Sequence, residues 1–126
     1  MSYQNPARDL YNDGSDITCR ATAKVTGKTF AAISGARVDN LIGITTAAAG
    51  ARTAGVVKYD ANTDDLVGVA RGSGRVITVT AGGAITAGDD IQVGANGKAI
   101  KATDGVVVGY AVDTATNGTD VPVSLL

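Results

Sequence analysis

The residues best suited to binding a cation in this chain are three oxygen-bearing side chains at alternate positions of one short segment. Asp60, Asn62 and Asp64 stand where a calcium-binding loop has its first, third and fifth ligands. Such a loop also needs glycine in sixth place and glutamate in twelfth place, where this chain has Asp65 and Arg71. Asp and Asn are equally typical of turns, because their side chains bond to the nearby backbone. We interpret the segment as a solvated turn, leave weak cation binding there open, and predict no metal site and no cofactor.

Two glycine–lysine steps resemble the end of a phosphate-binding loop, but both lack its other residues. The motif requires a glycine five residues before its last glycine, and Thr22 stands there ahead of Gly27 and Lys28. At the second step Lys98 is followed by Ala99, which has no hydroxyl for a metal ion. We expect both steps to be ordinary hairpin turns.

No set of side chains is suited to acid–base or nucleophilic catalysis. The chain has no His, and its acidic residues are all Asp. Adjacent carboxylates such as Asp64 and Asp65 point to opposite faces of a strand and do not share a site. Cys19 falls on the apolar face of its strand, where a buried structural role is expected. We therefore predict that the protein is not an enzyme.

The overall charge and the apolar segments exclude several classes of partner. Eleven basic and twelve acidic residues give a net charge of -1, with no clustered positive field for nucleic acid. The longest apolar segment, 106–112, is far shorter than a membrane span. The first residues are polar, and a single cysteine cannot form an internal disulfide, so neither secretion nor membrane attachment is expected.

The composition predicts an all-β fold of many short strands. There are fifteen Val, eight Ile and fifteen Thr but no Glu, which favours strands over helices. Seventeen Gly recur between short apolar segments and mark chain reversals. We predict one β domain over residues 16–126, preceded by an extended N-terminal arm over residues 1–15.

Local patterns place several strands within that domain. Residues 17–25 alternate apolar and polar types, as in a strand with one buried face. The segment 94–97 contains Asn96-Gly97 and predicts a hairpin connection. Residues 106–112 are the most apolar and are expected at the centre of a sheet. Pro122 suggests that the last strand is an edge strand or begins at one. No repeat at a fixed period is visible.

The N-terminal arm has the side chains of a contact segment. Two of the four tyrosines lie within its first eleven residues, accompanied by an arginine. Tyr and Arg are enriched at binding hot spots, so we expect the arm to order on a partner. The predicted contact residues are Tyr3, Asn5, Pro6, Arg8, Leu10 and Tyr11.

Several segments resemble the head-decoration, or capsid cement, proteins of tailed bacteriophages. The similar segments are Thr53 to Asp60, Leu66 to Arg71, Ala84 to Val93, Asn96 to Ala99, Val107 to Val112 and Val121 to Leu125. A short polar leader running into an Ile-Thr strand, as at Ile17-Thr18, is similar too. The resemblance covers most of the chain.

The resemblance implies a β-barrel-like or β-tulip-like sandwich of short antiparallel strands that forms homotrimers. Such trimers sit on the outer capsid surface of the virion, between capsomers, and their N-terminal arms reach onto the major capsid protein. Their function is to stabilise the shell mechanically, without catalysis or a cofactor. The protein would be made in the cytoplasm of the host bacterium. Only the arm, Ser2 to Ser15, is carried over as a contact region.

Two other functions stay open from the sequence. A carbohydrate-binding or adhesin-type β module would suit the strands, although the chain has no Trp. A biotinyl- or lipoyl-like carrier domain would place a modified lysine at a hairpin tip, and Lys98 lies close to such a tip.

Overall fold

The computed structural model describes residues 4–5 and 16–126, and its regular structure is almost entirely β-strand. Within those residues the chain forms ten strands and one short 3-10 turn. Their bounds are β1 Ile17–Ala21, β2 Phe30–Ile33, β3 Ile42–Thr46, β4 Gly55–Val57, β5 Leu66–Ala70, β6 Val76–Thr80, β7 Asp90–Val93, η1 Ala95–Gly97, β8 Ala99–Lys101, β9 Gly109–Ala111 and β10 Asp120–Leu125. The all-β class predicted from the composition is confirmed.

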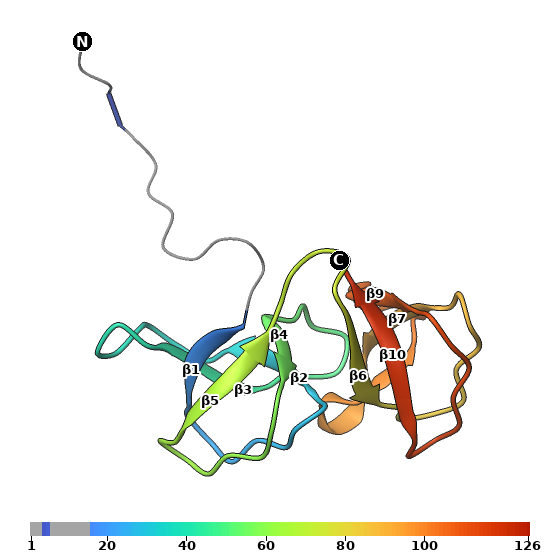
Figure 1. Cartoon of the computed structure of the whole chain (residues 1–126), viewed down its shortest axis with the longest axis horizontal. Helices are drawn as coiled ribbons and strands as arrows, with labels where there is room; N and C mark the ends of the chain where they lie inside the picture. Colours follow the sequence, from blue (N-terminus) through green and yellow to red (C-terminus); the bar gives the residue numbers. More distant parts are fainter. Residues whose placement is uncertain (1–3, 6–15) are drawn as a thin grey trace.

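The first five strands close into a barrel in the order β1-β3-β2-β4-β5 (Figure 1). Every pairing is antiparallel except β1 with β3, which run parallel. Alternate residues of each strand point inward, and small and β-branched side chains fill the interior. The buried cluster is Ile17, Cys19, Ala21, Val25, Ala31, Ile44, Val57, Ala61, Val67 and Val69. We call residues 17–70 the first unit.

The last five strands form a second sheet, in the order β6-β10-β9-β7-β8, on the other side of the molecule (Figure 1). All its ladders are antiparallel. The outer strands β6 and β8 come together at one isolated parallel bridge, Ala81 with Ala99. The sheet therefore curls toward a barrel and joins its edges at that one point. We call residues 76–125 the second unit.

The two units repeat the same arrangement of strands. β1 pairs with β5 as β6 pairs with β10, and β4 links β2 to β5 as β9 links β7 to β10. The isolated bridges correspond as well, since Val25–Ala61 in the first unit matches Ile85–Ala115 in the second. The first pair of equivalents is 60 residues apart and the second pair 54, so the sequence shows no fixed period.

A glycine occupies the same place in both units. Gly55 begins β4 and Gly109 begins β9. A Cβ atom at Gly55 would collide with the carbonyl oxygen of Ala70, and one at Gly109 with that of Ser124. Only glycine lets neighbouring strands approach this closely. Both units therefore need a glycine at this position, and the repeat is visible in that need even where the other side chains differ.

Phe30 connects the cores of the two units. On β2, Ala31 points into the barrel, so Phe30 points outward, beside its cross-strand partner Val56. Both outward side chains are fully buried, because they pack with the interior of the second unit. The Thr80 N–H also donates to the Lys28 carbonyl oxygen at 2.9 Å. The second unit thus covers the outer face of the barrel at β2 and β4.

Three local predictions need correction. β1 ends at Ala21; the Thr22 N–H still donates to the Ile44 carbonyl, and Val25 then forms an isolated bridge with Ala61 outside the strands. The 106–112 segment contributes only β9, which does lie in the middle of the sheet, and Val106 instead donates its N–H to the first unit.

β10 is an internal strand in spite of Pro122. The Pro122 carbonyl accepts the Val112 N–H just past the end of β9, so its missing N–H faces the end of that ladder and not β6.

The predicted hairpin at 94–97 is confirmed. It joins β7 to β8, which pair antiparallel. Asn96 and Gly97 have φ values of 59° and 73°, the left-handed region that Asn-Gly turns use.

Candidate interaction surfaces

Of the six predicted contact residues of the N-terminal arm, the structure describes Asn5. Tyr3, Pro6, Arg8, Leu10 and Tyr11 lie outside the described residues. Asn5 is described, and with Gln4 it forms an exposed bend in which its φ is 51°. The contact role of the arm therefore stays a prediction.

Asp16 fixes the point at which the arm joins the folded chain. It directly precedes β1, and one carboxylate oxygen lies 2.6 Å from a guanidinium nitrogen of Arg75. The other carboxylate oxygen accepts a hydrogen bond from the Lys58 ammonium at 3.0 Å. Lys58 follows β4, whereas Arg75 lies between β5 and β6. The start of β1 is therefore tied to the first unit and to the connection between the units.

The two cations change the acidity of Asp16. The hydrogen bond from Lys58 is the largest influence, and with that from Arg75 it lowers the pKa of the Asp16 carboxyl below its ordinary value of 3.8. Partial burial opposes this effect without cancelling it. The carboxylate is therefore ionised, and both ion pairs are formed, at every pH above this lowered pKa.

The carboxylates of the candidate cation loop are engaged in structural contacts. Asp60 accepts the Gly27 N–H at 2.8 Å, and Asp64 pairs with Arg20 at 2.9 Å. The Asn62 N–H donates to the Asp65 carboxylate at 3.0 Å. No group of three metal-ligating side chains occurs anywhere in the described ranges 4–5 and 16–126. The interpretation as a turn fits these contacts.

The glycine–lysine step at Gly27 is used for folding in a similar way. Lys28 has a φ of 61° and extends its ammonium to Asp120 of β10, 3.1 Å away, so it links the two units. The Thr29 hydroxyl donates to the Thr26 carbonyl at 2.6 Å and closes the turn. Both residues therefore serve a turn between strands.

Cys19 is fully buried within the barrel. Desolvation raises the pKa of its thiol above the ordinary value, with a smaller opposing effect from Arg71. The thiol is therefore protonated at neutral pH, as expected of a structural cysteine.

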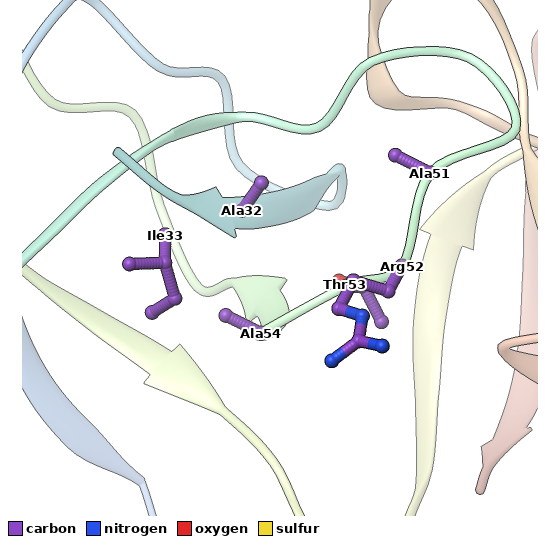
Figure 2. Close-up of a pocket in the computed structure, with 6 residues that line it drawn as sticks. All are labelled: Ala32, Ile33, Ala51, Arg52, Thr53 and Ala54. Atoms are coloured by element: carbon purple, nitrogen blue, oxygen red, sulfur yellow. The ribbon is translucent and has the colours of Figure 1, made fainter. Parts of the chain in front are cut away.

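A shallow apolar pocket opens beside β2. Figure 2 shows it between Ala32 and Ile33 on β2 and the segment 51–54 that approaches β4. The space, open to solvent, measures about 420 Å³. The Thr53 hydroxyl donates to the Ala31 carbonyl at 2.8 Å, so it holds the wall in place. Arg52 is the one charged side chain of the lining, and Ile33 is 58% exposed. The pocket suits a small apolar group.

A second apolar surface lies on the outer face of the second unit. Tyr110 of β9 is 48% exposed, and Val76 of β6 is 54% exposed. Ser124 of β10 lies between them in register, and it is buried by its neighbours. We call this surface the Tyr110 face and define it by Val76, Thr78, Tyr110, Val112 and Pro122. The Tyr110 face has more exposed bulky side chains than the pocket beside β2.

The sequence contained a signal for this face. In residues 106–112, Tyr110 and Val112 fall on one side of an alternating pattern, and Ala111 falls on the other. Read as a uniformly apolar segment, the same residues predicted burial on both sides.

Within the described ranges, no helix is long and apolar enough to cross a bilayer.

Comparison with known proteins finds similarity to proteins of bacteriophages. The sequence model of a family described as phage cement protein matches residues 11–125. The structure resembles the crystal structure of the head fiber gp8.5 N base in bacteriophage phi29, with a TM-score of 0.75 and 30% sequence identity. That similarity covers 88% of this chain and 92% of the phi29 chain. No curated protein sequence matches.

Proposed function

Because this chain belongs to the phage cement protein family, we propose that it binds the outside of an assembled bacteriophage capsid as a trimer and bridges neighbouring capsomers. Family and structural match make it a structural protein of the phage virion. The observation that carries the proposal is the extent of the family match, which includes both β units and residues 11–15 of the arm. The partner is the major capsid protein, reached partly through the N-terminal arm. Synthesis takes place in the host cytoplasm.

Multiplicity gives such a protein its strength. A chain of 126 residues offers little contact area, so a single copy binds weakly. Once one arm of a trimer is bound, the other two bind from a high local concentration, and the overall affinity exceeds that of any single contact. Because the trimer binds the assembled shell and not free subunits, it stabilises that shell by mass action.

The fold suits a protein that transmits force without chemistry. The side chains that the sequence offered as candidates for chemistry take part in turns, ion pairs and the buried core. Their engagement supports a non-enzymatic role. Asp16 holds the start of β1 against both Lys58 and Arg75, so the arm leaves from a defined position on the folded chain. A fixed exit lets three arms reach fixed places on a lattice.

The decisive experiment removes the arm and measures capsid binding. Heads of the parent phage that lack this protein are mixed with the full chain or with a chain lacking residues 2–15. Sedimentation and electron microscopy then measure occupancy. We expect the shortened chain to keep its thermal transition and circular dichroism spectrum and to lose binding. Equal occupancy by the two chains would refute the role of the arm. Failure of the full chain to bind any head, empty or expanded, would refute the proposed function.

A further inference from the structure

The internal repeat permits a comparison of one sheet face in its covered and uncovered forms. In the first unit, Phe30, Val56 and Ala70 lie side by side on β2, β4 and β5 and point out of the barrel. In the second unit the equivalent strands β7, β9 and β10 place Asp90, Tyr110 and Ser124 in the same row. The two rows occupy the same position in two copies of one topology.

The row of the first unit is completely covered. Phe30, Val56 and Ala70 are each 0% exposed, and the first two belong to the hydrophobic cluster of the second unit. The fold therefore uses this face of a β unit as a docking surface for another β unit of the same chain. The contact combines apolar packing with a backbone hydrogen bond from Thr80 to Lys28.

In the second unit the row is uncovered at Asp90 and Tyr110 in the single chain, and bulky apolar side chains of neighbouring positions gather around Tyr110. Val76 lies on the far side of Ser124 from Tyr110 in the same row, and Val112 lies in the next row beside Pro122. Val76, Tyr110 and Val112 are each about half exposed, at 54%, 48% and 49%. Charged residues bound the apolar side chains, because Asp90 is the direct cross-strand partner of Tyr110 on β7, and Asp120 on β10 already pairs with Lys28. An apolar centre with charge at its rim is the composition of a protein–protein interface.

We propose that the Tyr110 face is the surface through which one copy of this chain contacts a second copy, with Tyr110 at its centre. The occupant is another copy because the equivalent face in the first unit is already filled by a β unit of this chain. Burial of the three half-exposed apolar side chains, Val76, Tyr110 and Val112, also suits a permanent contact between subunits better than a reversible one. The proposal rests on the trimer of the proposed function and assigns the contact that builds it.

The test is the substitution Tyr110→Lys. The new lysine would stand directly across from Asp90, so an attractive cross-strand pair replaces the aromatic ring and the sheet is preserved. A buried ammonium at the centre of the contact would block self-association. We expect the dissociation constant of the oligomer to rise about 30-fold or more, the effect of removing an aromatic hot spot. Val112→Lys is a second variant at the Tyr110 face, just past the end of β9.

The matched control is Leu66→Asp. Leu66 is 56% exposed on β5 of the first unit, away from the Tyr110 face. Its equivalent in the second unit is an aspartate, and its cross-strand partner is Arg20, so a carboxylate suits the position. Light scattering coupled to size exclusion, over a range of concentrations, measures the mass of all four proteins. We expect the wild-type chain and the control to be oligomers and both lysine variants to approach the monomer mass of 12.5 kDa.

Three results overturn the proposal. The first is a wild-type chain that is monomeric at every concentration. The second is a pair of lysine variants that keep their folded spectrum and the wild-type oligomer mass. If they also lose binding to capsids, the face contacts the shell and not another copy, and the proposed function survives while this inference fails. The third is a chain lacking residues 2–15 that becomes monomeric with the Tyr110 face intact, because the arm would then make the contact.

Discussion

Replacement of Phe30 by alanine tests whether the two β units share one core. Phe30 points out of the barrel yet is 0% exposed, because it packs into the second unit. Truncation of a fully buried Phe to Ala typically costs about 3–5 kcal/mol. If the two units were independent, Phe30 would face solvent, and the same substitution would change stability by roughly 0.5 kcal/mol or less. The two views therefore differ by several kcal/mol.

The expected shift in Tm follows from the length of the chain. Unfolding entropy near 2.1 cal/mol/K per residue gives about 0.26 kcal/mol/K for a chain of this length. A loss of 3–5 kcal/mol then lowers Tm by about 12–20 °C. Differential scanning calorimetry at one fixed protein concentration measures the shift, because self-association would otherwise change Tm. Phe30→Leu keeps most of the volume and should cost about 1 kcal/mol.

The repeat provides an internal control for Phe30. Asp90 occupies the equivalent position of the second unit and is exposed, so Asp90→Ala should leave Tm within about 2 °C of the wild-type value. A Phe30→Ala variant that melts within about 4 °C of the wild-type protein would refute the shared core. An Asp90→Ala variant whose Tm falls as far as that of the Phe30→Ala variant would also refute it.

Two further substitutions test the anchor of the arm and the glycine of the repeat. Asp16→Asn removes the ion pairs to Lys58 and Arg75 and should cost about 0.5–1 kcal/mol at pH 7, since both pairs are partly exposed. Because the folded-state pKa of Asp16 is lowered, the wild-type advantage should be complete above its ordinary value of 3.8 and should disappear as the pH falls through the folded value. Melting curves of the two proteins that stay equally far apart at pH 2 and pH 7 would contradict this account. Gly109→Ala drives a Cβ into the Ser124 carbonyl oxygen and should destabilise the protein by about 1–3 kcal/mol in urea titrations. Gly83→Ala, where a Cβ would meet only open space, should change stability by less than about 0.5 kcal/mol, and equal effects of the two substitutions would count against the close approach.

The sequence predicted features that depend on neighbouring residues. The alternation after Ile17 placed the inward side of β1 correctly, because a strand with one face in the barrel must alternate. The Asn96-Gly97 hairpin was predictable because few residue pairs adopt positive φ at both positions. The carboxylates of 60–65 were interpreted as turn residues, and their contacts to Gly27 and Arg20 agree with that.

Features that depend on distant contacts were not predictable in this way. The outward burial of Phe30 is caused by a second unit that follows it by dozens of residues, and no local pattern records which side of a strand another sheet will cover. The repeat was missed because the spacing between equivalent residues changes partway along. The missing N–H of Pro122 by itself predicts an edge strand, whereas the end of β9 leaves that position of an internal strand with no acceptor to bond. For the Tyr110 face, the alternation of Tyr110, Ala111 and Val112 indicates an exposed side locally, but the rest of the face comes from β6 and β10 and depends on their pairing.

The Asp16 anchor has a mechanical consequence. Any pull that reaches residue 16 along the strand axis enters β1, which is held by hydrogen bonds to β3 on one side and β5 on the other. Such a load shears both ladders together instead of opening them one bond at a time, and rupture then requires many bonds to fail at once. The Arg75 contact diverts part of the same load to the base of β6, so tension on one end is divided between two halves of the molecule.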